Sequence, residues 1–184
     1  MRLRGESVEL RTVSQSDQAI IASWRNKDHV MNGLFSYMPL SVAQQEQWFQ
    51  SYLGRDDELL FVIEAEGGVP IGTIGLSQID TRNRSAEYGR MLIGEVAFLR
   101  RGYAQDATLL LLRYAFENLG LHRVYLEVLS DNQAAIRLYK RCFFTVEARL
   151  HLSHFTRGKF RDVLLMAVLE DEYRIGMENR SYES

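Results

Sequence analysis

A turn that carries two arginines and a glycine is the first place where this sequence shows residues suited to chemistry. Arg100-Arg101-Gly102 precedes an apolar run of about four helical turns, with Gln105 and Asp106 in its opening turn. A helix N-terminus leaves several backbone N–H groups unpaired and carries about half a positive charge, and glycine lets a ligand approach the backbone. The stretch Gly94–Leu119 therefore predicts a phosphate-binding site, although a plain solvated connection would use the same residues.

Composition limits what kind of protein can hold such a site. The chain has 184 residues, 46% hydrophobic and 25% charged, which suits a single domain over 1–184, with a core from about 8 to 173 and a polar tail over 174–184. A formal charge of −2 and a pI near 6.1 lack the basic excess typical of nucleic-acid binding. The single cysteine, Cys142, excludes an internal disulfide. No stretch has the pattern of a signal peptide or a membrane span, so we expect a cytoplasmic protein.

Apolar periodicity and turn residues outline the elements that precede the turn. Ser14 or Ser16 caps a first helix, and Ser41 opens a capping box for a second helix that stops at Gly54. Strands are predicted at Val8–Val13, Leu59–Ala65, Ile71–Ile79 and Ala86–Ile93, and the last three form an antiparallel meander.

The second half of the chain predicts a parallel pair of strands. A helix over Ala104–Leu119 connects the strand Ala86–Ile93 to a strand over Val124–Val128, and a crossover of this kind makes the two strands parallel. A V-shaped gap can then open between them. Asn132 caps the next helix, and two further strands follow at Phe144–Phe155 and Phe160–Leu169.

Three segments at this spacing resemble a known family. They are L-R-R-G-Y-A before the helix, L-E-V in the next strand, and N-Q-A-A-I-R-L-Y-K-R-C-F-F after it. Together with the order of elements over about Val8–Tyr173, they resemble the GNAT superfamily of acetyl-CoA-dependent N-acetyltransferases. The resemblance implies an α/β (α+β) fold with a mixed, mostly antiparallel sheet of about seven strands, a parallel central pair splayed around the cofactor, and about four flanking helices. It also implies a monomer or homodimer.

The resemblance implies that the turn binds the pyrophosphate of acetyl-CoA. The backbone donors would be those of Arg101, Gly102, Tyr103, Ala104 and Gln105. Arg100 would pair with phosphate through its guanidinium group. Two residues depart from the family pattern: Leu99 stands where relatives have glutamine or arginine, and Phe143 where they usually have glycine.

Three further roles follow from the same resemblance. The backbone N–H groups at the splayed end of the strand, at Met91, Leu92 and Ile93, would bind the developing oxyanion. Asn132 would hydrogen-bond the pantetheine arm, and Tyr139 would protonate the departing thiolate. Without the resemblance, Tyr139 reads as an ordinary core aromatic on the apolar face of its helix.

The amine must lose a proton before it attacks. A lysine-like amine has a pKa of about 10.4, so a base is needed near neutral pH. Glu87 and Glu127 lie on the strands that flank the gap and are the candidate bases, although either would also suit a paired strand glutamate. His151 and His154 are three residues apart on a strand and point to opposite faces, so we expect no metal site.

The acceptor is inferred from the segment between the first strand and Gly54. Trp24, Arg25, Phe35, Tyr37 and Met38 are the predicted substrate-binding residues. Aromatic residues suit a nucleotide base and arginine suits a diphosphate, so a nucleotide-linked amino sugar is the first choice, as in one branch of the family. The alternatives are a protein N-terminus, as in the ribosomal-protein branch, and then a polyamine or an antibiotic. A protein that binds CoA without turnover is the alternative from another class.

Overall fold

The computed structural model describes residues 1–36 and 38–182, which form one eight-stranded sheet with helices on both faces. The strands are β1 (Arg2–Arg4), β2 (Glu9–Thr12), β3 (Leu59–Ala65), β4 (Val69–Asp80), β5 (Ser85–Ile93), β6 (Arg123–Leu129), β7 (Thr145–Thr156) and β8 (Lys159–Leu169). The α-helices are α1 (Gln18–Arg25), α2 (Asp28–Met31), α3 (Val42–Tyr52), α4 (Tyr103–Arg113), α5 (Gln133–Arg141) and α6 (Glu170–Tyr182).

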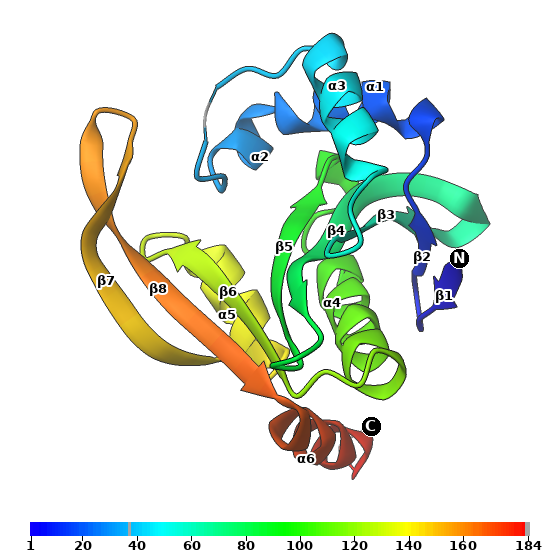
Figure 1. Ribbon diagram of the computed structural model, residues 1–184, viewed down its shortest axis with the longest axis vertical. Coiled ribbons are helices and arrows are strands. Elements are labelled where there is room, and N and C mark those ends of the chain that lie inside the picture. The colour runs from blue at the N-terminus through cyan, green and yellow to red at the C-terminus, as the bar shows by residue number, and fades with distance from the viewer. Residues whose placement is uncertain (37, 183–184) are drawn as a thin grey trace.

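The sheet order is β1-β2-β3-β4-β5-β6-β8-β7, and the pair β5–β6 alone is parallel among the described strand pairs. In Figure 1, α1, α2 and α3 gather at one end of the sheet, and β7 and β8 form a long bent hairpin that projects from the rest of the molecule. The predicted meander over β3, β4 and β5 and the predicted parallel pair are both confirmed.

Local sequence signals begin α3 and α5 where they were expected, whereas Ser14, a predicted cap of the first helix, begins a 3-10 turn over Gln15–Asp17 that leads into α1. The Ser41 hydroxyl accepts from the Gln44 amide at 3.2 Å, and the Gln44 side chain accepts from the Ser41 amide at 2.9 Å, which completes the capping box. The Asn132 side chain accepts from the Ala135 amide at 3.2 Å and caps α5. These caps fix the N-terminal ends of α3 and α5.

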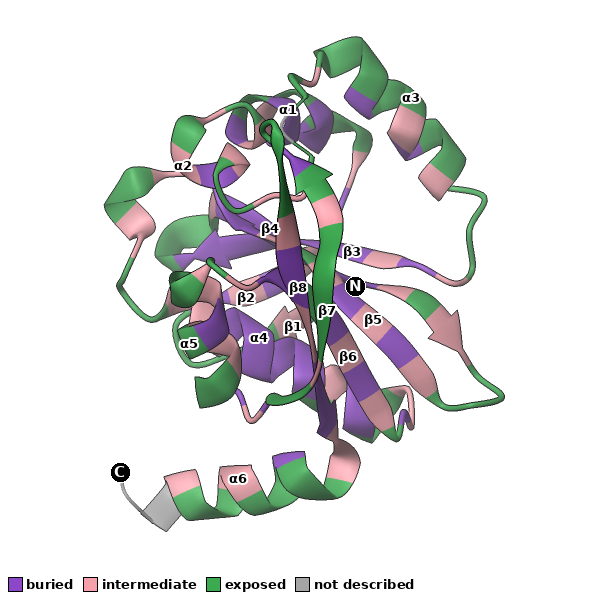
Figure 2. Ribbon diagram, turned by 90° about the vertical axis from the view of Figure 1, so that its left-hand side faces the viewer, coloured by how far each residue is buried: buried purple, intermediate pink, exposed green. Residues whose placement is uncertain are grey.

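Two apolar clusters lie on opposite faces of the sheet. The larger one packs α4 and α5 against the central strands, and Figure 2 shows α4 and these strands as mostly buried, in contrast to the exposed β7. The smaller one packs α1 and α3 against β3 and β5 through Trp24, Phe49, Leu60, Val62 and Leu92. The end of β5 therefore contributes to both clusters, with Ile93 in the larger and Leu92 in the smaller.

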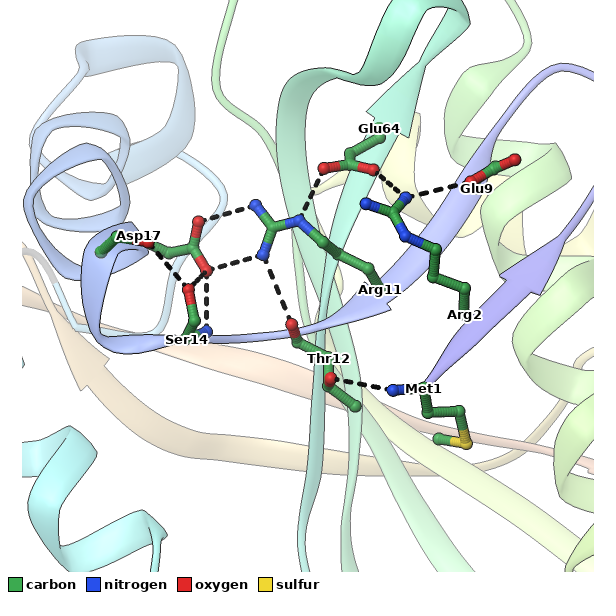
Figure 3. A network of polar contacts seen from close by, with 9 residues as sticks. Met1, Arg2, Glu9, Arg11, Thr12, Ser14, Asp17 and Glu64 are labelled. Atoms are coloured by element: carbon green, nitrogen blue, oxygen red, sulfur yellow. Dashed lines mark hydrogen bonds and ion pairs between the residues drawn. The ribbon is translucent and has the colours of Figure 1, made fainter.

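A network of ion pairs ties the first edge of the sheet to α1 (Figure 3). Arg11 donates to Glu64 on β3 at 2.6 Å and to both carboxylate oxygens of Asp17 at 2.8 and 2.7 Å. Burial disfavours the charge of Asp17, but hydrogen bonds from Arg11 and Ser14 outweigh it and lower the pKa of Asp17. The network therefore fixes the position of the chain between β2 and α1.

Four features differ from the predicted elements. β1 is an additional strand, too short and charged to recognise, and α2 is a single short helix inside the predicted acceptor segment. The helix after Gly102 changes into a π-helical turn over Tyr114–Asn118 before it ends at Gly120. The predicted polar tail is largely α6, because Tyr173 is buried and Met177 packs against the larger cluster. No helix in the described part of the chain is long and apolar enough to cross a membrane.

Candidate active site

The parallel strands β5 and β6 separate soon after they begin. Their pairing consists of Ser85 with Arg123, Ala86 with Val124 and Glu87 with Tyr125, whereas β5 continues to Ile93. The end of β5 is held instead by β4, where Gly72 pairs with Ile93. A Cβ at Gly72 would come within 2.0 Å of the Leu92 carbonyl oxygen, so only glycine allows this approach. Residues at the end of β5 line three neighbouring cavities.

The cofactor cavity, of about 600 Å³, lies between α5 and the turn before α4. Gly102 is the N-cap of α4 and has a φ of +87°, a conformation that glycine adopts without strain. The amides of Tyr103 and Ala104 belong to the first helical turn and have no intrahelical acceptor. The five residues predicted as backbone donors, Arg101, Gly102, Tyr103, Ala104 and Gln105, all line this cavity.

Four arginines surround the same cavity. Arg100 and Arg101 were predicted, whereas Arg137 and Arg141 on α5 were not. The guanidinium of Arg101 lies 5.7 Å from the ring centre of Tyr103. None of the described lining residues is acidic. The i, i+4 spacing of Arg137 and Arg141 on one helix face is a signal that could have identified them.

Asp106, in the opening turn of α4, has a structural role. Its carboxylate accepts from the amides of Glu6, Ser7 and Val8 at 3.2, 2.5 and 3.0 Å. It therefore holds the turn between β1 and β2 against α4, and it is absent from the lining of the cofactor cavity.

The central cavity, of about 180 Å³, is lined by the residues predicted to bind the oxyanion, to hold the pantetheine arm and to protonate the thiolate. Met91, Leu92 and Ile93 line it from β5, and Asn132 and Tyr139 line it from α5. It shares Leu99 and Ile93, among others, with the cofactor cavity, so the two adjoin.

Tyr139 is packed among aromatic rings at the wall of this cavity. Its ring centre lies 5.6 Å from that of Tyr88 and 5.9 Å from that of Phe144. Burial raises the pKa of the Tyr139 phenol far above its ordinary value, so the hydroxyl keeps its proton. The structure thus combines the two interpretations of this residue, because its ring is a core aromatic and the residue also lines the cavity.

His29 is a residue of the site that the sequence did not reveal. It lies on α2, lines both the central and the cofactor cavities, and its Nε2 is 3.1 Å from the carbonyl oxygen of Ile93. If Nε2 donates in this bond, Nδ1 remains free to accept a proton. A lone histidine in a long segment gives no sequence signal for this position.

The predicted bases lie away from the three cavities. Glu87 accepts from Gln78 at 2.6 Å and from Ser77 at 3.4 Å, at the point where β5 and β6 separate. Glu127 is exposed on β6 and pairs in register with Leu165 of β8. Neither residue is among those that line the central cavity.

The acceptor cavity, of about 260 Å³, lies between β4, β5 and the helices α1 and α3. It shares Leu34 and Leu92 with the central cavity. Arg25 and Phe35 line it, as predicted for substrate-binding residues, and Trp48 and Arg90 line it as well. The other polar lining residues are Ser36, Gln45 and Thr73.

The remaining predicted substrate-binding residues have other positions. Trp24 is fully buried, donates to Glu95 at 3.0 Å and packs under Gly94. It therefore packs α1 against the sheet and does not line the acceptor cavity. Met38 is 72% exposed and lines none of the three cavities. Tyr37 lies outside the described residues.

Phe143, which stands where the family pattern has glycine, combines a strained backbone with a well-packed ring. Its φ of +72° is strained for a residue with a side chain, but its ring packs against Gly176 of α6 and lies 6.3 Å from the ring of Tyr173. The residue thus connects the end of α5 to α6, outside the cavities.

Comparison with known proteins agrees with this geometry. The family model described as an acetyltransferase (GNAT) domain matches residues 7–145, and the chain belongs to this family. It is 29% identical to spermidine N(1)-acetyltransferase of Vibrio cholerae serotype O1 over 164 residues, which cover 89% of this chain and 94% of the relative. It is 27% identical to the Escherichia coli K12 protein of the same name, over 91% of this chain and 88% of the relative.

Solved structures show the same likeness. The crystal structure of spermidine N-acetyltransferase from Vibrio cholerae in complex with CoA and spermine superposes with a TM-score of 0.84 at 28% identity, covering 91% of this chain and 98% of that one. The chain is therefore an acetyl-CoA-dependent N-acetyltransferase with the predicted fold. The narrower expectation of a ribosomal-protein or amino-sugar branch is not supported, because these relatives are named for spermidine.

Proposed function

We propose that this enzyme transfers the acetyl group of acetyl-CoA to a primary amine of a small molecule by direct attack within a ternary complex. The observation that carries the proposal is the row of three adjoining cavities, in which the central one shares lining residues with a cationic cofactor cavity and with an acceptor cavity. Acetyl-CoA supplies a thioester that is already activated. The chain's own residues need only bind and orient the two substrates and move protons between them.

The turn before α4 would hold the cofactor phosphates. The amides of Tyr103 and Ala104 point out of an uncapped helix start, and four arginines add charge around them. The fit is supported by the open space at Gly102, where a Cβ would meet no atom within 4 Å. Asn132 would orient the pantetheine arm with the side-chain NH₂ that its capping bond leaves available.

Proton movements define the chemical step. As the amine nitrogen bonds to the acetyl carbon and the carbon–sulfur bond breaks, Tyr139 would donate its proton to the thiolate. The backbone at the end of β5 would bind the oxyanion. For the amine proton, His29 joins Glu87 and Glu127 as a candidate base, because it lines the central cavity whereas the two glutamates would act through water.

Polyamines are the acceptors that the names of the relatives suggest, and spermidine is the first amine to test. The experiment measures acetyl-CoA binding by calorimetry and then CoA release with spermidine, glucosamine, nucleotide-linked amino sugars and a peptide N-terminus. We expect binding at micromolar acetyl-CoA and amine-dependent release with a small molecule. Failure to bind acetyl-CoA would overturn the proposal, and release with the peptide alone would redirect it to a protein acceptor.

A further inference from the structure

The acceptor cavity contains two arginines that differ in their partners. Arg90 donates to Glu58 through Nε at 3.0 Å and through a terminal nitrogen at 2.6 Å, and its guanidinium lies 4.8 Å from the ring centre of Trp48. Glu58 is fully buried beneath it. Arg90 is therefore fixed in place, and it also lines the cavity.

Arg25 has no such support. It is half-buried at the end of α1, and no hydrogen bond or ion pair joins its guanidinium to a described residue of the chain. Burial and the neighbouring charge of Arg90 both lower the pKa of Arg25, so two positive groups face each other in a confined space. A charge that is partly removed from water without a partner destabilises the protein, and an anion between the two groups would relieve this.

The rest of the cavity supplies no counter-charge. Its described lining contains no aspartate or glutamate, and the carboxylate of Glu58 is already paired with Arg90. Guanidinium groups bind carboxylate and phosphate through paired hydrogen bonds. A polyamine, which carries only positive charge, would meet repulsion at this position.

We propose that the acceptor of this enzyme carries a carboxylate or phosphate group beside its amine, and that Arg25 and Arg90 bind this group. The inference rests on the proposed function and adds the substrate class to it. Leu34 and Leu92 border both the acceptor and the central cavities, so an anion held at Arg25 leaves the amine end of the molecule directed toward Tyr139. The residues that select the acceptor are thus separate from those that carry out the transfer.

Anion binding is tested first, on protein saturated with CoA so that the cofactor cavity is filled. Inorganic pyrophosphate and succinate are titrated separately, to distinguish phosphate from carboxylate, and Trp48 fluorescence is the readout because Arg90 stacks on this ring. We expect at least one anion to bind, and Arg25→Gln to raise its Kd by about tenfold or more. Arg82→Gln, at the exposed turn between β4 and β5 and outside the three cavities, is the matched control and should leave this Kd unchanged, and Trp48→Phe should abolish the signal.

Acetyl transfer is tested with matched pairs of amines. Ethanolamine is compared with phosphoethanolamine, glucosamine with glucosamine 6-phosphate, and propylamine with β-alanine, with spermidine as the wholly cationic reference. We expect an anionic member to have a kcat/KM about tenfold or more above its partner and above spermidine, and Arg25→Gln to remove this advantage. If neither anion binds the CoA-loaded protein, or if spermidine is the better acceptor and Arg25→Gln leaves it unaffected, the inference is overturned while the acetyltransferase activity stands.

Discussion

The cofactor cavity and the acceptor cavity are both lined by arginine, but they are built in different ways. At the cofactor cavity, a single continuous stretch supplies a helix N-terminus and two cationic side chains, and the ligand would contact mainly backbone. At the acceptor cavity, side chains come from α1, α3, β3, β4, β5 and the segment after α2. A site built from backbone can be found from a local motif, whereas one built from scattered side chains depends on the complete fold.

The sharpest test of the junction between these cavities is Tyr139→Phe. The variant removes one hydroxyl and little volume, so we expect a fall in kcat of roughly a hundredfold with folding and acetyl-CoA affinity preserved. Because burial raises the pKa of this phenol, wild-type activity should show no loss from Tyr139 ionisation up to about pH 10. Steady-state kinetics across pH measure both effects, and normal turnover in the variant would return Tyr139 to a purely packing role.

The two acceptor arginines should respond oppositely to neutralisation. Arg90→Gln leaves the buried carboxylate of Glu58 with Arg55, at 3.4 Å, as its remaining cationic partner among the described residues, so we expect a loss of about 1.5–3 kcal/mol in unfolding free energy. Arg25→Gln removes an unpaired charge and should leave stability unchanged or raise it. Urea unfolding of the ligand-free variants measures the difference, and an equal loss in both would mean that Arg25 has a structural partner.

At the cofactor cavity, Gly102→Glu should place a carboxylate against the phosphates. We expect the Kd for acetyl-CoA to rise at least tenfold, about 1.4 kcal/mol. Gly102→Ala is the matched control, because it bears the same strain of a positive φ without the charge. Calorimetry that finds equal binding by the two variants would show that the phosphates lie elsewhere.

Substitutions of Asn132 should have the smallest effects, and they distinguish its role as the cap of α5 from its proposed role in binding the pantetheine arm. Asn132→Ala removes the cap of α5 and should cost about 1 kcal/mol of stability. Asn132→Asp keeps the accepting oxygen but loses the NH₂ group, so stability should hold while the KM for acetyl-CoA rises a few-fold. If the KM is unchanged in Asn132→Asp, the residue serves only as a cap.

Much of the fold could be predicted because its signals are local. Ser41 with Gln44, Asn132 and Gly120 set helix ends, and alternating apolar residues gave the strands. The cofactor turn followed from the same kind of signal, although Arg137 and Arg141 were missed because they reach the cavity from another helix. β1 was missed because three residues with two charges carry no pattern.

The acceptor side could be predicted only in part. Arg25 and Phe35 were identified from the aromatic and arginine residues of their segment, and both line the cavity. Trp24 was chosen on the same ground, but it is buried under Gly94. His29 and Arg90 are placed by contacts with residues far away in the sequence, the first with the carbonyl of Ile93 and the second with the ring of Trp48. Such positions follow from the tertiary fold, so no single stretch of sequence reveals them.

Direct transfer between the two cavities is the central claim, and initial-rate kinetics test it most directly. A covalent route would need a nucleophile, but Cys142 is buried and burial raises its pKa to about 12, so it stays a protonated thiol. With acetyl-CoA and the best amine varied together, we predict intersecting double-reciprocal lines and no acetyl adduct by intact mass spectrometry when the amine is omitted. Parallel lines together with an acetylated protein would contradict the account.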